Sequence, residues 1–508
     1  MISNKVNKWK HCFEIGVIGC ITIWVGILCF YRLGEAATHN TDEARHIANA
    51  YEMFKNSEVW IHTYKSAPDY FNYKPPLSMW CIMLCFETFG INSVSMRLYS
   101  AVAGMLLYLA VIVFLRRKYS TCASVLFGLA FVSGTELFFF HGARSADADA
   151  LYLLLYVCAM LCLYLSEEKP YYLVLFGLCL SFCFLAKCFH VASALVIFLC
   201  YFPRLYKKVR WKHLVLCSLA GVMPVGLWAA VRFSYDGLTF FKGMLGSEVI
   251  DRVAESSDYL GYFFYLLKQP VCVVSAVIAA GSAVLSAIAV SACKEHADKT
   301  ENKGKMTGYA AVGFVYKKII GNRCYLFLLW FMVPFLIYSA SGAFMEWYSY
   351  VCFFPLYLLF AIQFSDFLKQ KKCLVFKILF IAGILLCTYV QGKEALHTLK
   401  YTKETGFRAD LKTLVQEEPT YRGAEIYIEK SGQEYKLQNE WEQNCVADAD
   451  ITGDFRPADG GVPLFLEKED ALLIISKDLF DGYCEVLAGR VIVVDGSDYL
   501  IFCNEFYE

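Results

Sequence analysis

The sequence predicts a polytopic α-helical membrane protein with a small soluble domain at its C-terminal end. Of its 508 residues, 58% are hydrophobic, 17% are aromatic and only 19% are charged, and the mean hydropathy is +0.45. These values differ clearly from those of ordinary soluble domains. The chain has 47 Lys and Arg residues and 47 Asp and Glu residues, so it carries no net positive charge that would favour nucleic acid as a partner.

Apolar runs long enough to cross about 30 Å of hydrocarbon recur along the first 391 residues. We expect about eleven transmembrane helices, at residues 13–31, 93–115, 120–140, 150–166, 170–187, 189–203, 213–233, 270–292, 323–341, 347–365 and 374–391. With these spans, the segments rich in Lys and Arg all fall on one side, which the positive-inside rule assigns to the cytoplasm. We therefore expect a multi-pass protein of the cytoplasmic (plasma) membrane with a cytoplasmic N-terminus.

The chain then divides at about residue 391. Residues 1–391 form the transmembrane domain, with a long first outer loop at 32–92, and residues 392–508 form the extracytoplasmic soluble domain. Short β-type runs in this tail, such as "EDALLIISKD", alternate with polar stretches and predict an α/β or α+β fold. The pair Asp495-Gly496 between two apolar runs predicts a hairpin.

The first outer loop contains "THNTDEARHIANAYEMF", whose apolar spacing predicts an amphipathic helix along the membrane surface. Asn40 can cap this helix, and Asp42 and Glu43 suit its first turn. These acids could serve only as caps, and Lys74, directly before two prolines, could simply reach lipid headgroups. An anchored acid and an anchored cation in one loop nevertheless favour a site for an anionic lipid headgroup.

Further charged residues lie in the other outward segments or interrupt apolar runs. They are Arg144, Asp147, Asp149, Lys187, Glu248 and Arg252. Each could be part of a solvated face, but charges at membrane depth are costly unless they serve a polar site. The segments that carry them converge on the outer leaflet, where cations could bind a lipid-linked phosphate and carboxylates could deprotonate a hydroxyl or steady a metal.

Four motifs follow one another in a familiar order: "DEARHIANAYEMF", "YFNYKPPLSMW", "ARSADADALYLLLY" and "LAKCF". On these residues the sequence resembles the polyprenyl-phosphate-sugar-dependent membrane glycosyltransferases of the C superfamily. It is similar in particular to the group of aminoarabinose lipid A transferase and the protein O-mannosyltransferase-like enzymes. The resemblance implies their fold. It also implies inverting transfer of a sugar from a donor such as an undecaprenyl-phosphate sugar at the outer face, with membrane lipids around the site.

The resemblance also assigns roles. Asp42 corresponds to the catalytic carboxylate with Arg45 holding it, Lys74 to the lysine that binds the donor phosphate, and Asp147 or Asp149 to the acid of the second outer loop. We count Arg45, Arg144, Lys187 and Arg252 with Lys74 as the phosphate-binding set. Glu43, Tyr73 and Glu248 are expected supporting residues.

The sequence departs from the family at the metal site. In the lipid A transferase, an acid before this lysine and a histidine in a later outer loop hold a metal. Here these positions are Tyr73 and Val249. We therefore assign no metal ligands and no certain cofactor, and a divalent metal elsewhere stays open.

A transporter or flippase of a lipid-linked or anionic substrate is the alternative function, because intramembrane charges such as Lys187 also mark substrate paths. A scaffold protein whose outer domain recruits partners is a third. The chain shows no internal repeat and concentrates its polar residues at one face, which favours the transferase. The sequence leaves the sugar open, and the acceptor can be a lipid, a protein or an envelope glycan.

Overall fold

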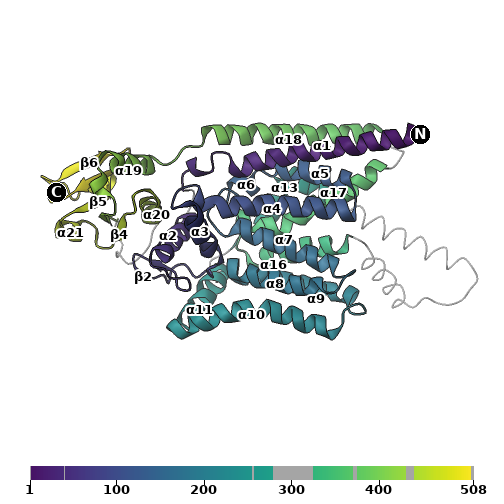
Figure 1. Cartoon of the computed structure of the whole chain (residues 1–508), viewed down its shortest axis with the longest axis horizontal. Coiled ribbons are helices and arrows are strands. Elements are labelled where there is room, and N and C mark those ends of the chain that lie inside the picture. The colour runs from purple at the N-terminus through teal and green to yellow at the C-terminus, as the bar shows by residue number, and fades with distance from the viewer. Residues whose placement is uncertain are drawn as a thin grey trace, which may run out of the picture.

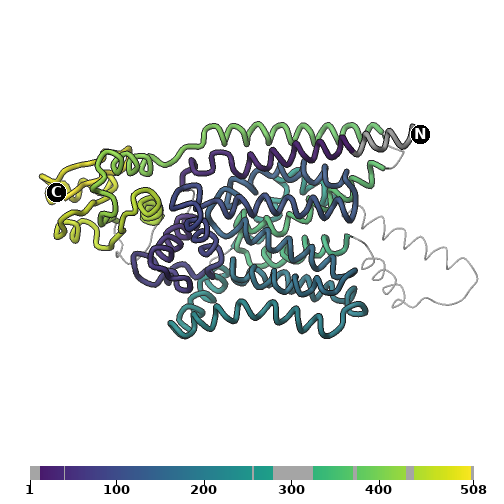
Figure 2. The backbone as a smooth tube through the Cα atoms, viewed as in Figure 1, coloured from purple at the N-terminus to yellow at the C-terminus, as the bar shows by residue number. Residues whose placement is uncertain are grey.

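Long apolar helices run side by side through most of the structure (Figure 1, Figure 2). The structure is a computed structural model that describes residues 2–38, 41–254, 257–277, 324–369, 374–430 and 440–504. Within these residues, six helical stretches are long and apolar enough to cross a membrane. They lie in α1 (Ile2–Phe30), α4 (Ser95–Lys118), α8 with α9 (Tyr172–Lys187 and Ala192–Leu205), α10 (Trp211–Asp236), α17 (Ser349–Lys369) and α18 (Leu374–Tyr401). Four shorter apolar helices accompany them: α3 (Leu77–Phe89), α5 (Thr121–Ser133), α7 (Asp149–Leu165) and α16 (Tyr325–Ser341).

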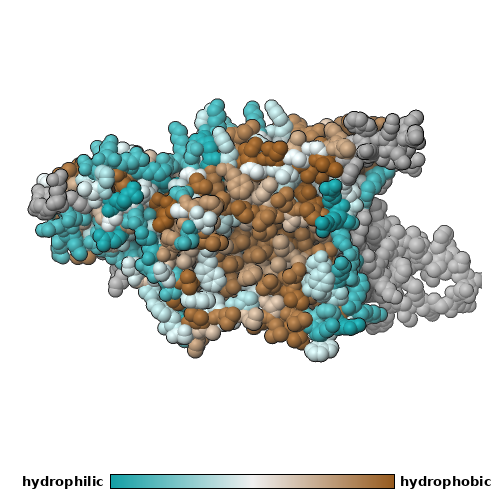
Figure 3. Space-filling view, viewed as in Figure 1, coloured by the Kyte–Doolittle hydropathy of each residue, from teal (hydrophilic) through white to brown (hydrophobic). Residues whose placement is uncertain are grey.

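Hydrophobic side chains form a broad band across the middle of the helix bundle, and hydrophilic side chains gather at both of its ends (Figure 3). The N-terminus and the basic last turn of α4, with Arg116, Arg117 and Lys118, lie at one end. The C-terminal sheet domain and α2 (Thr41–Lys55) lie at the other end (Figure 1). This distribution is the one expected of a bundle whose middle faces hydrocarbon.

Ten of the eleven predicted spans fall on apolar helices of the structure. The predicted span 270–292 lies mostly outside the described residues. Two boundaries differ from the prediction. The last span continues as α18 to Tyr401 instead of ending at residue 391, and the first outer segment contains α3, a separate apolar helix.

The hairpin of α8 and α9 turns at η2 (Cys188–Val191), at the end of the bundle where the thiol of Cys188 meets the carbonyl oxygen of Tyr73, and Cys188 has a φ of 49°. The rings of Phe176 and Phe198 lie 5.5 Å apart, so α9 folds back along α8. On its other side α8 packs closely against α10, because a Cβ at Gly177 would lie 2.2 Å from the carbonyl oxygen of Cys217. Small residues at such contacts let membrane helices approach each other.

The helix α2 forms as predicted, but it does not lie open along a membrane surface. Ala44, Ile47, Ala48 and Ala50 are all fully buried. The helix packs against α3 on one side and against α20 (Glu440–Gly453) of the C-terminal domain on the other (Figure 1). Its amphipathic pattern therefore reflects burial between two parts of the protein. The predicted Asn40 cap lies outside the described residues.

The C-terminal domain contains a five-stranded mixed sheet in the order β4-β3-β5-β7-β6. The strands are β3 (Glu425–Ile428), β4 (Arg456–Ala458), β5 (Ala471–Ser476), β6 (Val491–Asp495) and β7 (Tyr499–Cys503). The pairs β3–β4 and β3–β5 are parallel, and β5–β7 and β6–β7 are antiparallel. Helices α19 (Gly406–Glu417), α20, α21 (Gly461–Leu466) and α22 (Lys477–Phe480) complete it. The predicted domain type and the hairpin at Asp495-Gly496 are confirmed.

A buried polar network docks this domain onto the segment that leads into α2. Arg408, which is fully buried, donates from Nε and Nη2 to Asp448 Oδ1 at 2.9 and 2.5 Å. It also donates to the carbonyl oxygen of Ala36 at 3.1 Å and to the hydroxyl of Thr38 at 2.5 Å. Because the guanidinium is shared between the two parts, the domain fixes the chain just before the start of α2.

Candidate functional site

The three acids predicted to be catalytic gather at the end of the bundle that carries the sheet domain. Asp42 lies in the first turn of α2, Asp147 in the segment between α6 (Glu136–Phe139) and α7, and Asp149 at the start of α7. Asp147 and Asp149 are buried, whereas the Asp42 side chain is 20% exposed. Electrostatic interactions link Asp147 with both of the other carboxyl groups.

Two cations and a histidine surround the Asp42 carboxylate. Its Oδ1 lies 3.0 Å from Lys74 Nζ and 4.0 Å from Arg45 Nη2, and the Arg45 guanidinium lies 4.5 Å over the ring of Phe71. Burial opposes ionisation, but Lys74 and then Arg45 hold the pKa of Asp42 well below its usual range. Burial, helped by Lys74, lowers the pKa of His46 to about 4. At neutral pH the carboxylate is therefore charged and the neighbouring imidazole is neutral.

Amide side chains hold the segment that carries Lys74 against α2. Asn72 donates from Nδ2 to Asn49 Oδ1 at 2.8 Å, and Asn49 lies two turns beyond Asp42 on the same helix. The backbone N–H of Lys74 donates to Asn72 Oδ1 at 3.2 Å. Pro75 and Pro76 then restrict the backbone directly after the lysine. The helix α2 thus positions both the acid and the cation beside it.

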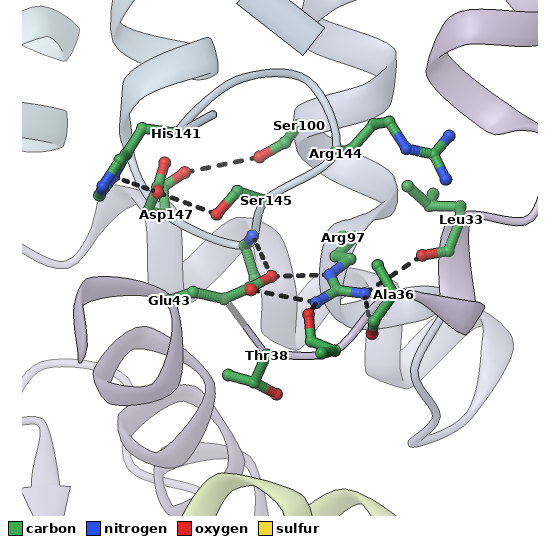
Figure 4. A network of polar contacts seen from close by, with 12 residues as sticks. Leu33, Ala36, Thr38, Glu43, Arg97, Ser100, His141, Arg144, Ser145 and Asp147 are labelled. Atoms are coloured by element: carbon green, nitrogen blue, oxygen red, sulfur yellow. Dashed lines mark hydrogen bonds and ion pairs between the residues drawn. The ribbon is translucent and has the colours of Figure 1, made fainter. Parts of the chain in front are cut away.

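A buried ion pair between Glu43 and Arg97 joins α2 to the start of α4 (Figure 4). Arg97 donates from Nε to Glu43 Oε1 at 2.7 Å and from Nη2 to Oε2 at 3.0 Å, and both side chains are fully buried. Glu43 Oε1 also accepts the backbone N–H of Ala146 at 2.9 Å, next to Asp147. The remaining Arg97 donors reach the carbonyl oxygens of Leu33, Ala36 and Ala37. The predicted supporting residue Glu43 therefore ties Asp42 to Asp147 through neighbouring residues.

The second outer segment, residues 140–148 between α6 and α7, pairs Asp147 with His141. The Nδ1 of His141 lies 2.7 Å from Asp147 Oδ2, which also accepts the Ser145 hydroxyl at 2.9 Å (Figure 4). Burial acts against both charges, but each partner favours the charged form of the other, so the pKa of His141 is raised and that of Asp147 is lowered. The His141 ring stacks on Trp347 at a centroid distance of 3.9 Å. Tyr99 fixes the backbone by donating to the Asp147 carbonyl oxygen at 2.5 Å.

A second acid–cation pair lies beside the first. Lys187, the last residue of α8, is buried and forms an ion pair with Asp149 Oδ1. Its ammonium also lies 4.5 Å from the centroid of the Tyr348 ring. Arg252, in α12 (Asp251–Ala254), places its guanidinium carbon 5.8 Å from the same ring. The ring of Tyr348 therefore lies near two cations that reach it from different helices.

These two cations share their surroundings with Lys74. All three interact electrostatically with Cys188 in η2. The Cys188 thiol lies 3.7 Å from the carbonyl oxygen of Tyr73, the residue before Lys74. Three cations from three segments thus converge near the turn between α8 and α9, which makes this region suited to a phosphate group.

The structure places Arg144 outside this set. Its guanidinium is buried and donates to the carbonyl oxygens of Leu28 at 3.1 Å and Arg32 at 3.0 Å. Figure 4 shows it turned away from Asp147. These contacts join the second outer segment to the end of α1. They favour a structural role for Arg144 over the phosphate-binding role that the sequence predicts.

The two other predicted supporting residues take different positions. Tyr73 packs against α11 (Thr239–Leu245), with its ring 5.4 Å from that of Phe240. Glu248, in η3 (Gly246–Ile250), lies 3.2 Å from Arg252 Nη2 and holds that cation. Tyr73 therefore offers no metal ligand at the position where the lipid A transferase has an acid.

One group of the described residues could hold a divalent metal. His141, Asp147 and Asp149 each offer one ligand atom, and these atoms lie within 4.8 Å of one another. A nitrogen and two carboxylate oxygens form a donor set that zinc accepts. A metal there would compete with Lys187 for Asp149. This group differs from the positions of Tyr73 and Val249, where the resemblance would place ligands.

Four residues of the site were missed from the sequence: Arg97, His141, Trp347 and Tyr348. His141 stands two residues before the motif "ARSADADALYLLLY", so its place near two acids was a usable signal. Trp347 and Tyr348 lie in a short loop between two apolar runs. Trp and Tyr are common where transmembrane helices meet the membrane interface, so these two residues gave only a general signal. Nothing in the local pattern links Arg97 to Glu43.

The fold and the site together define a polytopic membrane protein with buried acid–cation pairs at one end of its helices. The chain matches the family model described as dolichyl-phosphate-mannose-protein mannosyltransferase over residues 73–228. A comparison with curated proteins found no match.

Solved structures match nearly the whole chain. ArnT from Cupriavidus metallidurans bound to undecaprenyl phosphate is 12% identical over 96% of this chain and 97% of its own, with a TM-score of 0.63. The archaeal oligosaccharyltransferase AglB from Archaeoglobus fulgidus, in complex with an inhibitory peptide and a dolichol-phosphate, is 12% identical over 94% of this chain and 71% of its own, with a TM-score of 0.51. These matches confirm the predicted fold class, because the chain shares the fold of both proteins over nearly its whole length.

Proposed function

We propose that the protein is a membrane glycosyltransferase, a hexosyl- or pentosyltransferase, that moves a sugar from a polyprenyl-phosphate donor to an acceptor with inversion. The observation that carries this proposal is the pairing of the Asp42 carboxylate with Lys74, with the cations Lys187 and Arg252 close by. One compact region thus offers both a base and a phosphate-binding set. The family match over residues 73–228 includes the lysine, the second acidic segment and Lys187.

In the proposed reaction Asp42 accepts the proton of the acceptor hydroxyl as its oxygen attacks the anomeric carbon of the donor. The new bond forms on one face of the sugar while the bond to the phosphate oxygen breaks on the other, and one displacement inverts the configuration. The phosphate leaves with the bonding electron pair. Lys74, Lys187 and Arg252 stabilise its charge, and Arg45 keeps Asp42 in place.

The pairs around Asp147 and Asp149 shape the acceptor side of this site. Asp147 is held by His141, and Asp149 by Lys187. When a donor phosphate binds Lys187, Asp149 loses part of its pairing and becomes available to accept a hydrogen bond. We assign both acids to the reaction centre, with Asp42 as the base.

The donor class is supported by relatives whose structures hold undecaprenyl phosphate and dolichol-phosphate. We propose the cytoplasmic membrane as the location, with residues 1–391 as the transmembrane domain and 392–508 as an extracytoplasmic domain. The basic turn at Arg116 to Lys118 lies at the end opposite the site, which the positive-inside rule assigns to the cytoplasm. The acceptor is a lipid, a protein or an envelope glycan.

A transfer assay separates this function from a transporter or flippase. Purified protein is incubated with radiolabelled undecaprenyl-phosphate hexose or pentose and a membrane extract. A transferase moves label to a new product. If the label stays on the donor and the protein only moves the donor between leaflets of vesicles, the alternative is correct.

A further inference from the structure

A cavity lies between the C-terminal half of α2 and the sheet domain. Its volume is about 470 Å³. It is lined by Tyr51, Glu52, Lys55, Asn56, Ser66, Gly423, Asp450, Asp454, Phe455, Arg456 and Pro457. Glu52 follows Asp42 by ten residues on α2, so the two side chains are about 15 Å apart along the helix axis. The cavity is therefore separate from the Asp42 site but built on the same helix.

Asp450 is the unexplained residue of this cavity. It is 1% exposed, and neither of its carboxyl oxygens has a hydrogen-bond partner among the residues that the structure describes. Burial of an unpartnered carboxyl group opposes folding, and buried polar groups in native proteins are nearly always paired. Two free acceptor positions at a cavity wall indicate a ligand that carries hydrogen-bond donors.

The other acids around Asp450 already have partners. Tyr51 donates its hydroxyl to Asp454 Oδ1, and Lys55 Nζ lies 2.9 Å from Asp454 Oδ2. Glu52 accepts the backbone N–H of Ser66 at 3.0 Å. Burial, together with Glu52 and Asp454, holds the pKa of Asp450 well above its usual range. In its neutral form the carboxyl group can donate one hydrogen bond as well as accept others.

The lining excludes several classes of ligand. The cations Lys55 and Arg456 are balanced by Glu52 and Asp454, so the lining offers no net positive charge to an anion, and most lining side chains are polar, which disfavours a lipid tail. A divalent metal lacks its ligand set here, because the only group of three or more candidate ligands in the described part of the chain is the one at His141. Hydroxyl groups suit the mixture of donors and acceptors, and the rings of Tyr51 and Phe455 offer apolar surface to a sugar ring.

We propose that this cavity binds a saccharide portion of the acceptor, with Asp450 as its central hydrogen-bonding group. The acceptor assignment rests on the proposed transferase function, whereas saccharide binding itself does not. A saccharide held here lies along α2 from Asp42. The sheet domain thereby contributes to acceptor selection, since Asp450, Asp454 and Arg456 all come from it.

Saccharide binding is measured on the full-length protein in detergent by saturation-transfer NMR, with a panel of neutral mono- and disaccharides and no donor. We expect at least one of them to bind wild type and the Asp478→Asn control, which changes an exposed acid of the same domain. Asp450→Asn should weaken that binding at least tenfold, because the amide nitrogen cannot accept a hydrogen bond where a carboxyl oxygen does. Absence of binding to wild type, equal binding by Asp450→Asn, or binding of Ca²⁺ in place of any sugar would overturn the proposal.

The transfer assay distinguishes this inference from the proposed function. If wild type transfers label, Asp450→Asn should raise the acceptor KM and leave kcat nearly unchanged. An unchanged acceptor KM would show that the cavity does not serve the acceptor. If wild type binds a saccharide but transfers no label, the transferase proposal fails and the binding site stands.

Discussion

Asp42 Oδ1 and Lys74 Nζ lie 3.0 Å apart, so the candidate base and the candidate phosphate ligand are paired with each other in the absence of substrate. This pairing keeps Asp42 ionised but makes it a weak base. A donor phosphate that binds Lys74 competes with the carboxylate and raises its basicity. The base would then become effective only when the leaving group is already in place.

Replacement of Lys74 by Gln tests this competition. We expect kcat/KM for the donor to fall about 10- to 100-fold, since a hydrogen bond to a charged group is worth about 1.5–3 kcal/mol. The donor KM should rise. The assay is initial-rate transfer of labelled sugar, with Lys468→Gln as a control for loss of an exposed lysine outside the site. A donor KM equal to that of wild type would remove Lys74 from phosphate binding.

The pH dependence of transfer should follow the pKa of Asp42. The active form is the carboxylate, so activity is lost as the pH falls through the pKa. Because Lys74 and Arg45 hold this pKa well below its usual range, wild type should keep its activity into mildly acidic solution. His46, with a pKa of about 4, stays neutral over that range. In Lys74→Gln the fall of kcat/KM on the acidic side of the pH profile should occur at higher pH than in wild type. An unchanged profile would show that Lys74 does not lower the pKa of Asp42.

The pair of Arg97 and Glu43 should matter for stability as well as activity. Removing one partner leaves a fully buried charge, which costs about 3–5 kcal/mol. Arg97→Met should therefore lower the Tm strongly. It should also reduce transfer, because Glu43 without its ion pair no longer fixes α2 beside the backbone of Ala146. The double variant Arg97→Met/Glu43→Gln should recover part of the Tm but not the activity. Equal Tm values for Arg97→Met and wild type would show that the pair does not stabilise the fold.

Lys187 should act on the donor and on Asp149 together. In Lys187→Met the buried Asp149 carboxylate loses its ion pair. We expect the donor KM to rise about tenfold or more, and Lys187→Arg to restore part of the donor binding because it keeps the charge. Donor titrations of both variants provide the measurement. Equal donor KM values in wild type and Lys187→Met would exclude Lys187 from the phosphate-binding set.

The sequence was informative where the chemistry lies within one motif. Asp42, Lys74, Asp147 and Asp149 stand at the ends of apolar runs, and charge at that depth is costly enough to indicate function. The helix spans could also be predicted, since hydrophobic length decides them. The contacts of Arg144 with the carbonyl oxygens of Leu28 and Arg32 could not be predicted, because a sequence shows the charge but not the groups that it meets.

Contacts between distant segments could not be predicted. Arg97 and Glu43 are 54 residues apart, and an arginine near a helix start ordinarily reaches for headgroups. The burial of α2 depends on α20, some 400 residues later in the chain, so its amphipathic pattern suggested a membrane surface instead. The sequence places His141 only six residues before Asp147, but the contact between its Nδ1 and that carboxylate becomes apparent only in the folded segment.

The central claim is that Asp42 is the base of a glycosyl transfer. Its most direct test compares wild type with Asp42→Asn in the labelled-donor assay, with Asp251→Asn as a control for an exposed acid at the same end. We predict that Asp42→Asn retains its fold and donor binding but loses at least about 100-fold in kcat, as expected for loss of a general base. Label transfer by Asp42→Asn at the wild-type rate would contradict the account.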